Sequence, residues 1–239
     1  MRHFLVYDGK SSYDFNMIIS GEDVFNKPSR VVRSTTIDGK NGSLTDDRGY
    51  FENAPITYKC GIKKEAGKSF DELASFIMSR GGGYHRLEDS YHPDCYRMAR
   101  CNGAISTTRR GYIADDGQPR VIEFELDFDC MPQLFLKEGE YTQEFTSDGT
   151  LYNPTYFEAK PLIRVYGTGS LNIGNTTLTV TSNPSYIDLD CEREDAYYGA
   201  QNCNGYIQGH DYPTLKSGIN NIAFTGFSKV EVTPRWWRI

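Results

Sequence analysis

The chain has 239 residues, enough for one large domain or two small ones, and its 38% hydrophobic and 24% charged residues are typical of a soluble folded protein. The formal net charge is −6 and no run of basic residues is longer than two, which excludes nucleic-acid binding through a basic surface. No apolar run approaches the roughly 20 residues of a membrane helix, and the N-terminus is too polar for a signal peptide, so we expect neither membrane insertion nor export.

The first third of the sequence predicts short strands. Apolar and polar residues alternate over 13–19 and again over 56–62. Between these strands, residues 35–53 are rich in the turn-forming residues Gly, Asn and Asp. We expect this segment to form a protruding hairpin or an excursion between strands. The 17 tyrosines of the chain favour β-structure and interfaces.

One segment, at about 69–80, predicts an α-helix. Ser69 and Glu72 have the spacing of a capping box, and Gly81 to Gly83 would end the helix. One face of this helix is apolar, and it consists of Phe70, Leu73, Phe76 and Ile77.

The clearest strand covers residues 121–130. Every second residue is apolar, and the residues between them are acidic: Glu123, Glu125, Asp127 and Asp129. Because side chains alternate across a strand, one face belongs to the core and the other carries a ladder of carboxylates. This acidic ladder is interpreted in three ways, as a solvated outer face, as a contact with a basic surface of a neighbouring subunit, or as a catalytic or metal-binding group.

A polar stretch after Met131-Pro132 predicts a linker over 136–153, between an N-terminal domain (1–135) and a C-terminal domain (154–239). The C-terminal domain predicts short strands with turn signals, which favours a β-sandwich or jelly roll. The protein is therefore expected to be mainly β, with a sandwich-like N-terminal domain that carries the one helix.

Motifs of catalysis and cofactor binding do not emerge from the sequence. Gly67-Lys68-Ser69 resembles the end of a phosphate loop, but the earlier glycine that such a loop needs is Ile62. His92, Cys95 and Cys101 could bind zinc but lack a fourth ligand, so we favour buried thiols and an exposed loop histidine. We expect no catalytic residue, no cofactor, no metal and six free thiols.

The Trp236-Trp237 pair could stack on a sugar ring. Consecutive strand residues point to opposite faces, so only one of the two could join such a platform and the other would close the core. A carbohydrate-binding β-sandwich with weak glycan binding is therefore one alternative function. A glycoside hydrolase that uses carboxylates of the acidic ladder is another.

Several phrases, in order and nearly from end to end, resemble the distal tail (Dit) proteins of long-tailed bacteriophages. They are IDGKNGSL (37–44), EFELDFDCMP (123–132), NPTYFEAKPLIRVYGTGSLNIGN (153–175), YIDLDCEREDAYYG (186–199), LKSGIN (215–220) and VEVTPRWW (230–237). The resemblance implies a structural protein of the virion tail, made in the cytoplasm of the bacterial host, and not an enzyme. It also implies that the C-terminal sandwich is galectin-like.

The resemblance further implies a homohexameric ring, formed by the N-terminal domains, that joins the tail tube protein to the tail-tip (tail-associated) protein and to receptor-binding proteins. Candidate subunit contacts are the apolar residues of a segment too turn-rich to be core: Ile37, Leu44, Tyr50 and Phe51. In such a ring the acidic ladder would line the bore through which DNA passes, or would pair with Arg109 and Arg110 of a neighbour.

Overall fold

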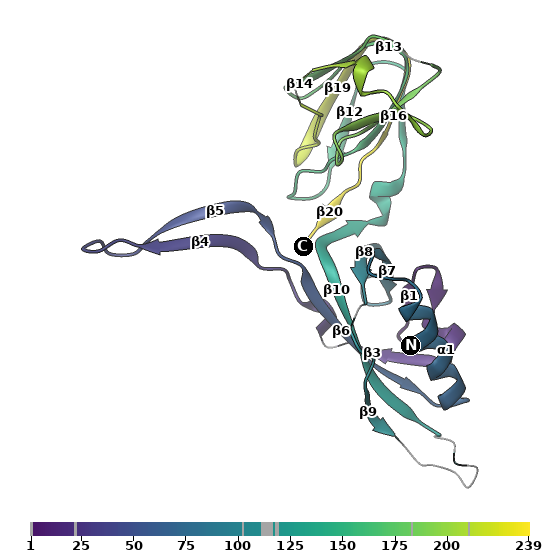
Figure 1. Ribbon diagram of the computed structural model, residues 1–239. Helices are drawn as coiled ribbons and strands as arrows, with labels where there is room; N and C mark the ends of the chain where they lie inside the picture. Colours follow the sequence, from purple (N-terminus) through teal and green to yellow (C-terminus); the bar gives the residue numbers. More distant parts are fainter. Residues whose placement is uncertain are drawn as a thin grey trace. The chain divides into compact units, whose positions relative to one another are not determined.

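The computed structural model describes residues 2–21, 23–101, 103–110, 117, 120–182, 184–209 and 211–239. Two compact units divide this chain between Leu134 and Phe135. Both units consist mainly of antiparallel strands (Figure 1). The expected mainly β fold, with one α-helix in the described residues, is confirmed.

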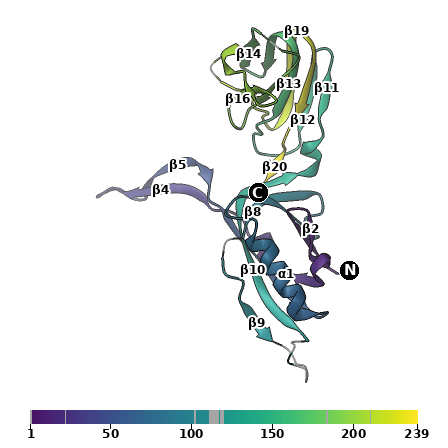
Figure 2. The same ribbon diagram turned by 45° about the vertical axis from the view of Figure 1, so that its right-hand side comes forward.

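The first unit is a curved sheet with a helix and a separate two-stranded ribbon (Figures 1 and 2). Its elements are β1 (Leu5–Tyr7), β2 (Lys10–Ser11), η1 (Ser12–Phe15), β3 (Met17–Ser20), η2 (Asp23–Phe25), β4 (Arg30–Thr36), β5 (Ser43–Phe51), β6 (Ala54–Ile62), α1 (Ala66–Met78), β7 (His85–Asp89), β8 (Cys95–Arg100), β9 (Thr107–Arg110) and β10 (Ile122–Leu136). The strand order is β2-β1-β7-β8-β10-β6-β3, with β9 paired to β10.

The expected alternation of β10 is confirmed, and it decides which face of the sheet is the core. Its buried residues are Phe124, Leu126, Phe128 and Cys130. The α1 helix covers this apolar face, where Phe70 packs edge-on against Phe124 with ring centroids 5.0 Å apart. Leu73 and Ile77 are buried in the same core, so the acidic residues of β10 lie on the opposite face.

The helix begins earlier than the capping-box spacing predicts. Its N-cap is Glu65, in the left-handed conformation with φ 47° and without a side-chain cap. Ser69 lies inside the first turns and is buried, with its hydroxyl donating to the Lys64 carbonyl and accepting from the Asn16 amide. The hydroxyl that the sequence assigns to a cap is therefore used to anchor the helix to η1.

The second unit is built around two long strands. Its elements are η3 (Lys137–Glu140), β11 (Gln143–Phe145), β12 (Gly149–Asn153), β13 (Leu162–Ile173), β14 (Thr176–Val180), β15 (Ile187–Asp190), β16 (Asp195–Tyr198), β17 (Gln201–Asn202), η4 (Asn204–Tyr206), β18 (Ile207–Gln208), β19 (Gly218–Thr233) and β20 (Trp237–Arg238). Strands β13 and β19 pair along their length, flanked at one end by β15 and β11 and at the other by β14 and β12.

Both long strands change direction where the register shifts, at the Gly167-Thr168-Gly169 sequence of β13 and near Gly226 of β19. A Cβ atom on Gly169 would collide with the Thr225 carbonyl oxygen, so only glycine permits the close approach of the two backbones. Ile163 and Leu171, from either side of this bend, are buried in one core. The bend thus lets the same two strands contribute to both layers of a β-sandwich.

The segment 136–153, expected to be a linker, is part of the second unit. It contains η3, β11 and β12, and both strands pair with β19. Its composition is polar because edge strands bury few side chains, among them Leu151. The pairing partner lies at 218–233, so the local sequence carries little sign of it.

Candidate functional site

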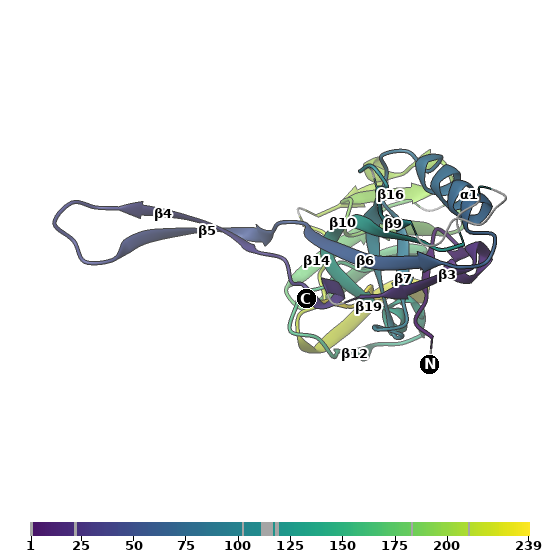
Figure 3. The same ribbon diagram turned by 90° about the horizontal axis from the view of Figure 1, so that it is seen from below.

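The segment that carries the candidate subunit contacts is a hairpin of β4 and β5 that leaves the sheet of the first unit (Figures 1 and 3). Thr36 pairs with Ser43, and the turn between them contains Gly39 and Gly42, both with positive φ. Gly is favoured at such positions because it has no Cβ to clash. Of the two structures considered for this segment, the protruding hairpin is therefore the one observed.

The hairpin buries neither of its faces against the described part of the chain. Leu44 is 57% exposed and Tyr50 is 58% exposed, and Ile37 and Val32 are exposed as well. The register places Val32 and Leu44 on opposite faces, so apolar side chains point outward on both. Phe51, at the base, is partly buried beneath the Arg30 guanidinium, which lies 5.2 Å from the ring centroid.

Ion pairs give this hairpin little stability. Arg30 Nε lies 2.7 Å from Asp47 Oδ2, but both side chains are about half exposed, and solvent screens the attraction between exposed charges. An isolated two-stranded ribbon is marginally stable in water. The exposed apolar side chains are therefore the feature that a partner surface would cover.

The acidic ladder lies on the outer face of the sheet, and the structure gives two of its carboxylates partners within the chain. Asp127 accepts a hydrogen bond of 2.6 Å from the Thr57 hydroxyl on β6. Asp129 pairs with Arg100 at 2.8 Å. Both partners belong to the first unit, so this end of the ladder is already bound within the chain.

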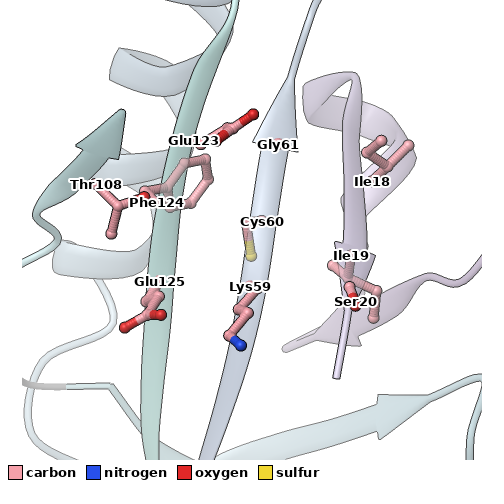
Figure 4. A pocket seen from close by; sticks show the side chains of 10 residues that line it. All are labelled: Ile18, Ile19, Ser20, Lys59, Cys60, Gly61, Thr108, Glu123, Phe124 and Glu125. Carbon is pink, nitrogen blue, oxygen red and sulfur yellow. The ribbon is translucent and has the colours of Figure 1, made fainter. Parts of the chain in front are cut away.

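The other end of the ladder borders a pocket of ≈ 320 Å³ on the outer face of β3, β6 and β10 (Figure 4). Glu123 and Glu125 line it from β10, Lys59 lines it from β6, and Ile18 lines it from β3. Lys59 is directly opposite Glu125 in the strand register. A row of carboxylates with one ammonium group beside it has a net negative charge, which is suited to contact a positively charged surface.

The side chains of Arg109 and Arg110 lie outside the described part of the structure. Their backbones belong to β9, where Arg109 is opposite Glu123 and Arg110 is opposite Ile122 of the same chain. The register thus places the Arg109 backbone beside the ladder of its own subunit.

A buried polar network lies at the root of the hairpin. Asp89 Oδ2 accepts a hydrogen bond from the Tyr58 hydroxyl (2.6 Å) and lies 3.3 Å from Arg97 Nη1, and Asp89 Oδ1 accepts from the His92 backbone N–H (2.8 Å). Arg97 also donates to the Val24 carbonyl in η2, just before β4. Burial alone would raise the pKa of Asp89, but the hydrogen bonds from His92 and Tyr58 and the nearby positive charges lower it overall.

This network accounts for His92, which we expected to be an exposed loop histidine. It is buried, its Nδ1 lies 3.2 Å from Asp89, and the Phe25 ring packs against it with centroids 5.0 Å apart.

Within the ranges that the structure covers, no three His, Cys, Asp or Glu side chains are grouped so as to hold a metal ion. All six cysteines are buried free thiols.

The tryptophan pair separates as the alternation predicts. Trp236 is buried in the core of the second unit. Trp237 stacks on Phe157 with centroids 4.3 Å apart and donates to the Glu158 carbonyl. One face of the Trp237 ring is therefore already covered.

No helix among the described residues is both long enough and apolar enough to cross a membrane.

The structure also gathers basic residues that the sequence did not single out. Arg2, Lys63 and Lys64 line a second pocket, of ≈ 630 Å³, beside β3. The only local sign of it is the Lys63-Lys64 dipeptide, which is too short to stand out among the 26 lysines and arginines of the chain.

Comparisons with known proteins identify the architecture. The Dit protein of phage SPP1, described as a paradigm of the hub adsorption apparatus in phages that infect Gram-positive bacteria, superposes with a TM-score of 0.71. The match covers 98% of this chain and 99% of that one, at 16% identity. The fold is that of a distal tail protein. The expected resemblance to Dit proteins is thereby confirmed at the level of the fold.

A second structure supports the same fold. A chain of the phage p2 baseplate in its activated conformation superposes with a TM-score of 0.55 and 12% identity, over 97% of this chain and 96% of that one. No family model matches the sequence, and no curated protein matches it. Because the identities of 12–16% are low, these two likenesses establish the fold.

Proposed function

We propose that this protein is a structural hub of a phage or prophage tail tip. Six copies form a ring that joins the tail tube protein to the tail-tip protein and to receptor-binding proteins. The observation that carries this proposal is the likeness to the SPP1 Dit protein over almost the whole of both chains. The second neighbour, from the p2 baseplate, is also a part of a phage tail structure.

The ring contacts are assigned to residues 1–135, and in particular to the hairpin. Its two unburied faces carry the exposed Ile37, Leu44 and Tyr50, and the partly buried Phe51 lies at its base, so it supplies apolar surface that a neighbouring subunit would cover. A cyclic interface uses two different patches of each subunit, so damage to one patch breaks every contact in the ring.

The acidic ladder of Glu123, Glu125, Asp127 and Asp129 has two roles compatible with such a ring. As a lining of the bore it would repel the phosphates of passing DNA. As a contact it would pair with Arg109 and Arg110 of the next subunit. Neutralising two carboxylates (Glu123→Gln, Glu125→Gln) distinguishes these roles, because the ring persists in the first case and weakens in the second.

The proposal also places the protein in the virion tail, after assembly in the host cytoplasm, and gives it no catalytic activity. Both statements rest on the neighbours, which are components of phage tails. Asp127 and Asp129, at one end of the ladder, already have partners within the chain, which is also more consistent with a contact surface than with an acid/base pair.

The deciding experiment is native mass spectrometry of the purified protein over a range of concentrations. We expect a hexamer for the wild type and a folded monomer for the double variant Leu44→Asp, Tyr50→Asp. The matched control is Tyr152→Asp with Ile219→Asp, an exposed cross-strand pair of the second unit, which should stay hexameric. Circular dichroism verifies folding.

Two results would count against the proposal. A wild type that is monomeric at every concentration contradicts the hub. A Leu44→Asp, Tyr50→Asp variant that stays hexameric removes the hairpin from the subunit contact.

A further inference from the structure

A buried pair of opposite charges lies where the β4–β5 hairpin joins the first unit. The pair consists of Asp89 and Arg97, which are 5% and 6% exposed. Burial removes both charges from water, and the attraction between them offsets this cost only in part. Such a pair therefore adds little stability beyond what apolar side chains of the same size would give, whereas its hydrogen bonds hold the groups that they join in defined positions.

The hydrogen bonds of this pair reach both segments that connect the hairpin to the sheet. Arg97 Nη2 donates to the carbonyl of Val24 (3.0 Å) in η2, which precedes β4. Arg97 Nη1 lies 3.3 Å from Asp89 Oδ2, and the same oxygen accepts from the hydroxyl of Tyr58 in β6, the strand that follows the hairpin. One carboxylate oxygen thus links the segment that enters the hairpin to the segment that leaves it.

The turn 89–92 holds the entering segment through further contacts. The Tyr91 hydroxyl accepts from the Gly21 N–H at 2.9 Å. The Phe25 ring packs against the rings of His92 and Tyr91, with centroids 5.0 and 6.2 Å apart. The N–H groups of Tyr91 and His92 both donate to Asp89 Oδ1, at 2.9 and 2.8 Å, so the same carboxylate also fixes this turn.

The hairpin acts as a lever, because its two faces are exposed along nearly the whole of β4 and β5. A strand of nine residues such as β5 is about 30 Å long, so a rotation of about 10° at the base would move the tip by about 5 Å. Apolar side chains lose contact when they separate by that much. The direction of the hairpin must therefore be fixed at its base.

We propose that Asp89 and Arg97 are positioning residues for assembly, which fix the direction in which the hairpin leaves the sheet so that its apolar side chains reach the neighbouring subunit. This inference rests on the proposed function, in which the hairpin makes the subunit contact. A cyclic ring closes only when every subunit presents its two patches at the same angle, so a loosened base affects every interface. The pair thus acts on assembly without touching the neighbour.

The first test is the double variant Asp89→Asn, Arg97→Met, which removes both charges and leaves neither of them buried alone. The matched control, Asp8→Asn with Arg80→Met, breaks another Arg–Asp contact of the first unit, of 2.8 Å, which is separate from the hairpin base. In native mass spectrometry we expect the test variant to need at least about tenfold more protein for half-assembly, and the control to assemble like the wild type. Circular dichroism verifies folding.

The second test measures the direction of the hairpin itself. Spin labels are attached at Lys40→Cys in the hairpin turn and at Lys68→Cys on α1, both exposed positions, while the six native thiols are buried. The Leu44→Asp, Tyr50→Asp background is used, so that no neighbouring subunit holds the hairpin. We expect the distribution of distances between the labels to be at least about twice as broad in the test variant as in its parent, and unchanged in the control. A loss of stability alone would not broaden the distribution within the folded population.

The same measurement with Tyr58→Phe, which releases only β6, decides the question if the double variant does not fold. The proposal is overturned if neither variant broadens the distance distribution, or if the double variant assembles like the wild type. A wild type that forms no ring would contradict the proposed function and the assembly role together. The label distances would then still show whether Asp89 and Arg97 fix the hairpin, because they are measured on single subunits.

Discussion

The carboxylate of Asp89 accepts a hydrogen bond of 2.6 Å from the hydroxyl of Tyr58, and both side chains are buried in the first unit. The Tyr58→Phe change removes this donor and leaves Asp89 with its remaining partners. A hydrogen bond to a charged group contributes about 1.5–3 kcal/mol, so we expect the free energy of unfolding of the first unit to fall by that amount. Tyr13→Phe, which removes an exposed bond to the Arg2 carbonyl, is the control and should cost less than about 0.5 kcal/mol.

The measurement is urea denaturation followed by two signals. Both tryptophans of the chain, Trp236 and Trp237, belong to the second unit, so tryptophan fluorescence reports its unfolding. Circular dichroism reports both units. The contribution of the first unit is the part of the dichroism transition that fluorescence does not follow. If Tyr58→Phe leaves this part unchanged and shifts only the fluorescence transition, Asp89 does not stabilise the first unit.

The stability of the first unit should depend on pH through Asp89. The folded state lowers the pKa of this carboxyl, so the unfolded chain binds its proton more readily. Its contribution is therefore fully present above the unfolded value of about 4 and is lost as the pH falls through the lower folded value. Tyr58→Phe removes one cause of the shift and should make this loss smaller. An equal pH dependence in wild type and variant, from denaturation midpoints between pH 2 and about 6, would contradict the assignment.

The second unit should be sensitive to a methyl group at Gly169. The Gly169→Ala side chain would meet the Thr225 carbonyl at the bend of β13, so the two long strands would have to separate there. We expect a loss of about 3 kcal/mol, seen as an earlier tryptophan fluorescence transition in urea. The control is Gly205→Ala in η4, where a Cβ has open space. Equal stability of the two variants would mean that β13 and β19 do not require the close approach.

The cysteines should react only after unfolding. Burial raises the pKa of Cys101 to about 11 and that of Cys130 to about 12, so few thiolates exist at neutral pH. We expect a thiol reagent to react slowly with the native protein and to count six thiols in denaturant without reductant. A count of four or fewer would show that disulfides form.

Features that depend on a local pattern could be predicted from the sequence. The alternation of apolar and acidic residues in β10 fixed its buried and exposed faces, because the side chains of a strand alternate wherever the strand lies. The spacing of apolar residues from Phe70 to Ile77 likewise predicted the apolar face of α1. The turn residues of 37–42 predicted a protruding hairpin or an excursion between strands, since glycine adopts positive φ without a tertiary partner.

Features that depend on partners distant in sequence could be seen only in the fold. Strands β11 and β12 look like a linker until β19, whose paired residues lie 65 to 89 positions later in the chain, supplies their hydrogen bonds. Ser69 looks like a helix cap until Asn16, 53 residues earlier, binds its hydroxyl. Asp89 and its buried donors carry no local pattern, and the basic pocket is signalled only by the Lys63-Lys64 dipeptide. A solitary buried charge or an exposed lysine acquires its meaning only from the groups that the fold brings beside it.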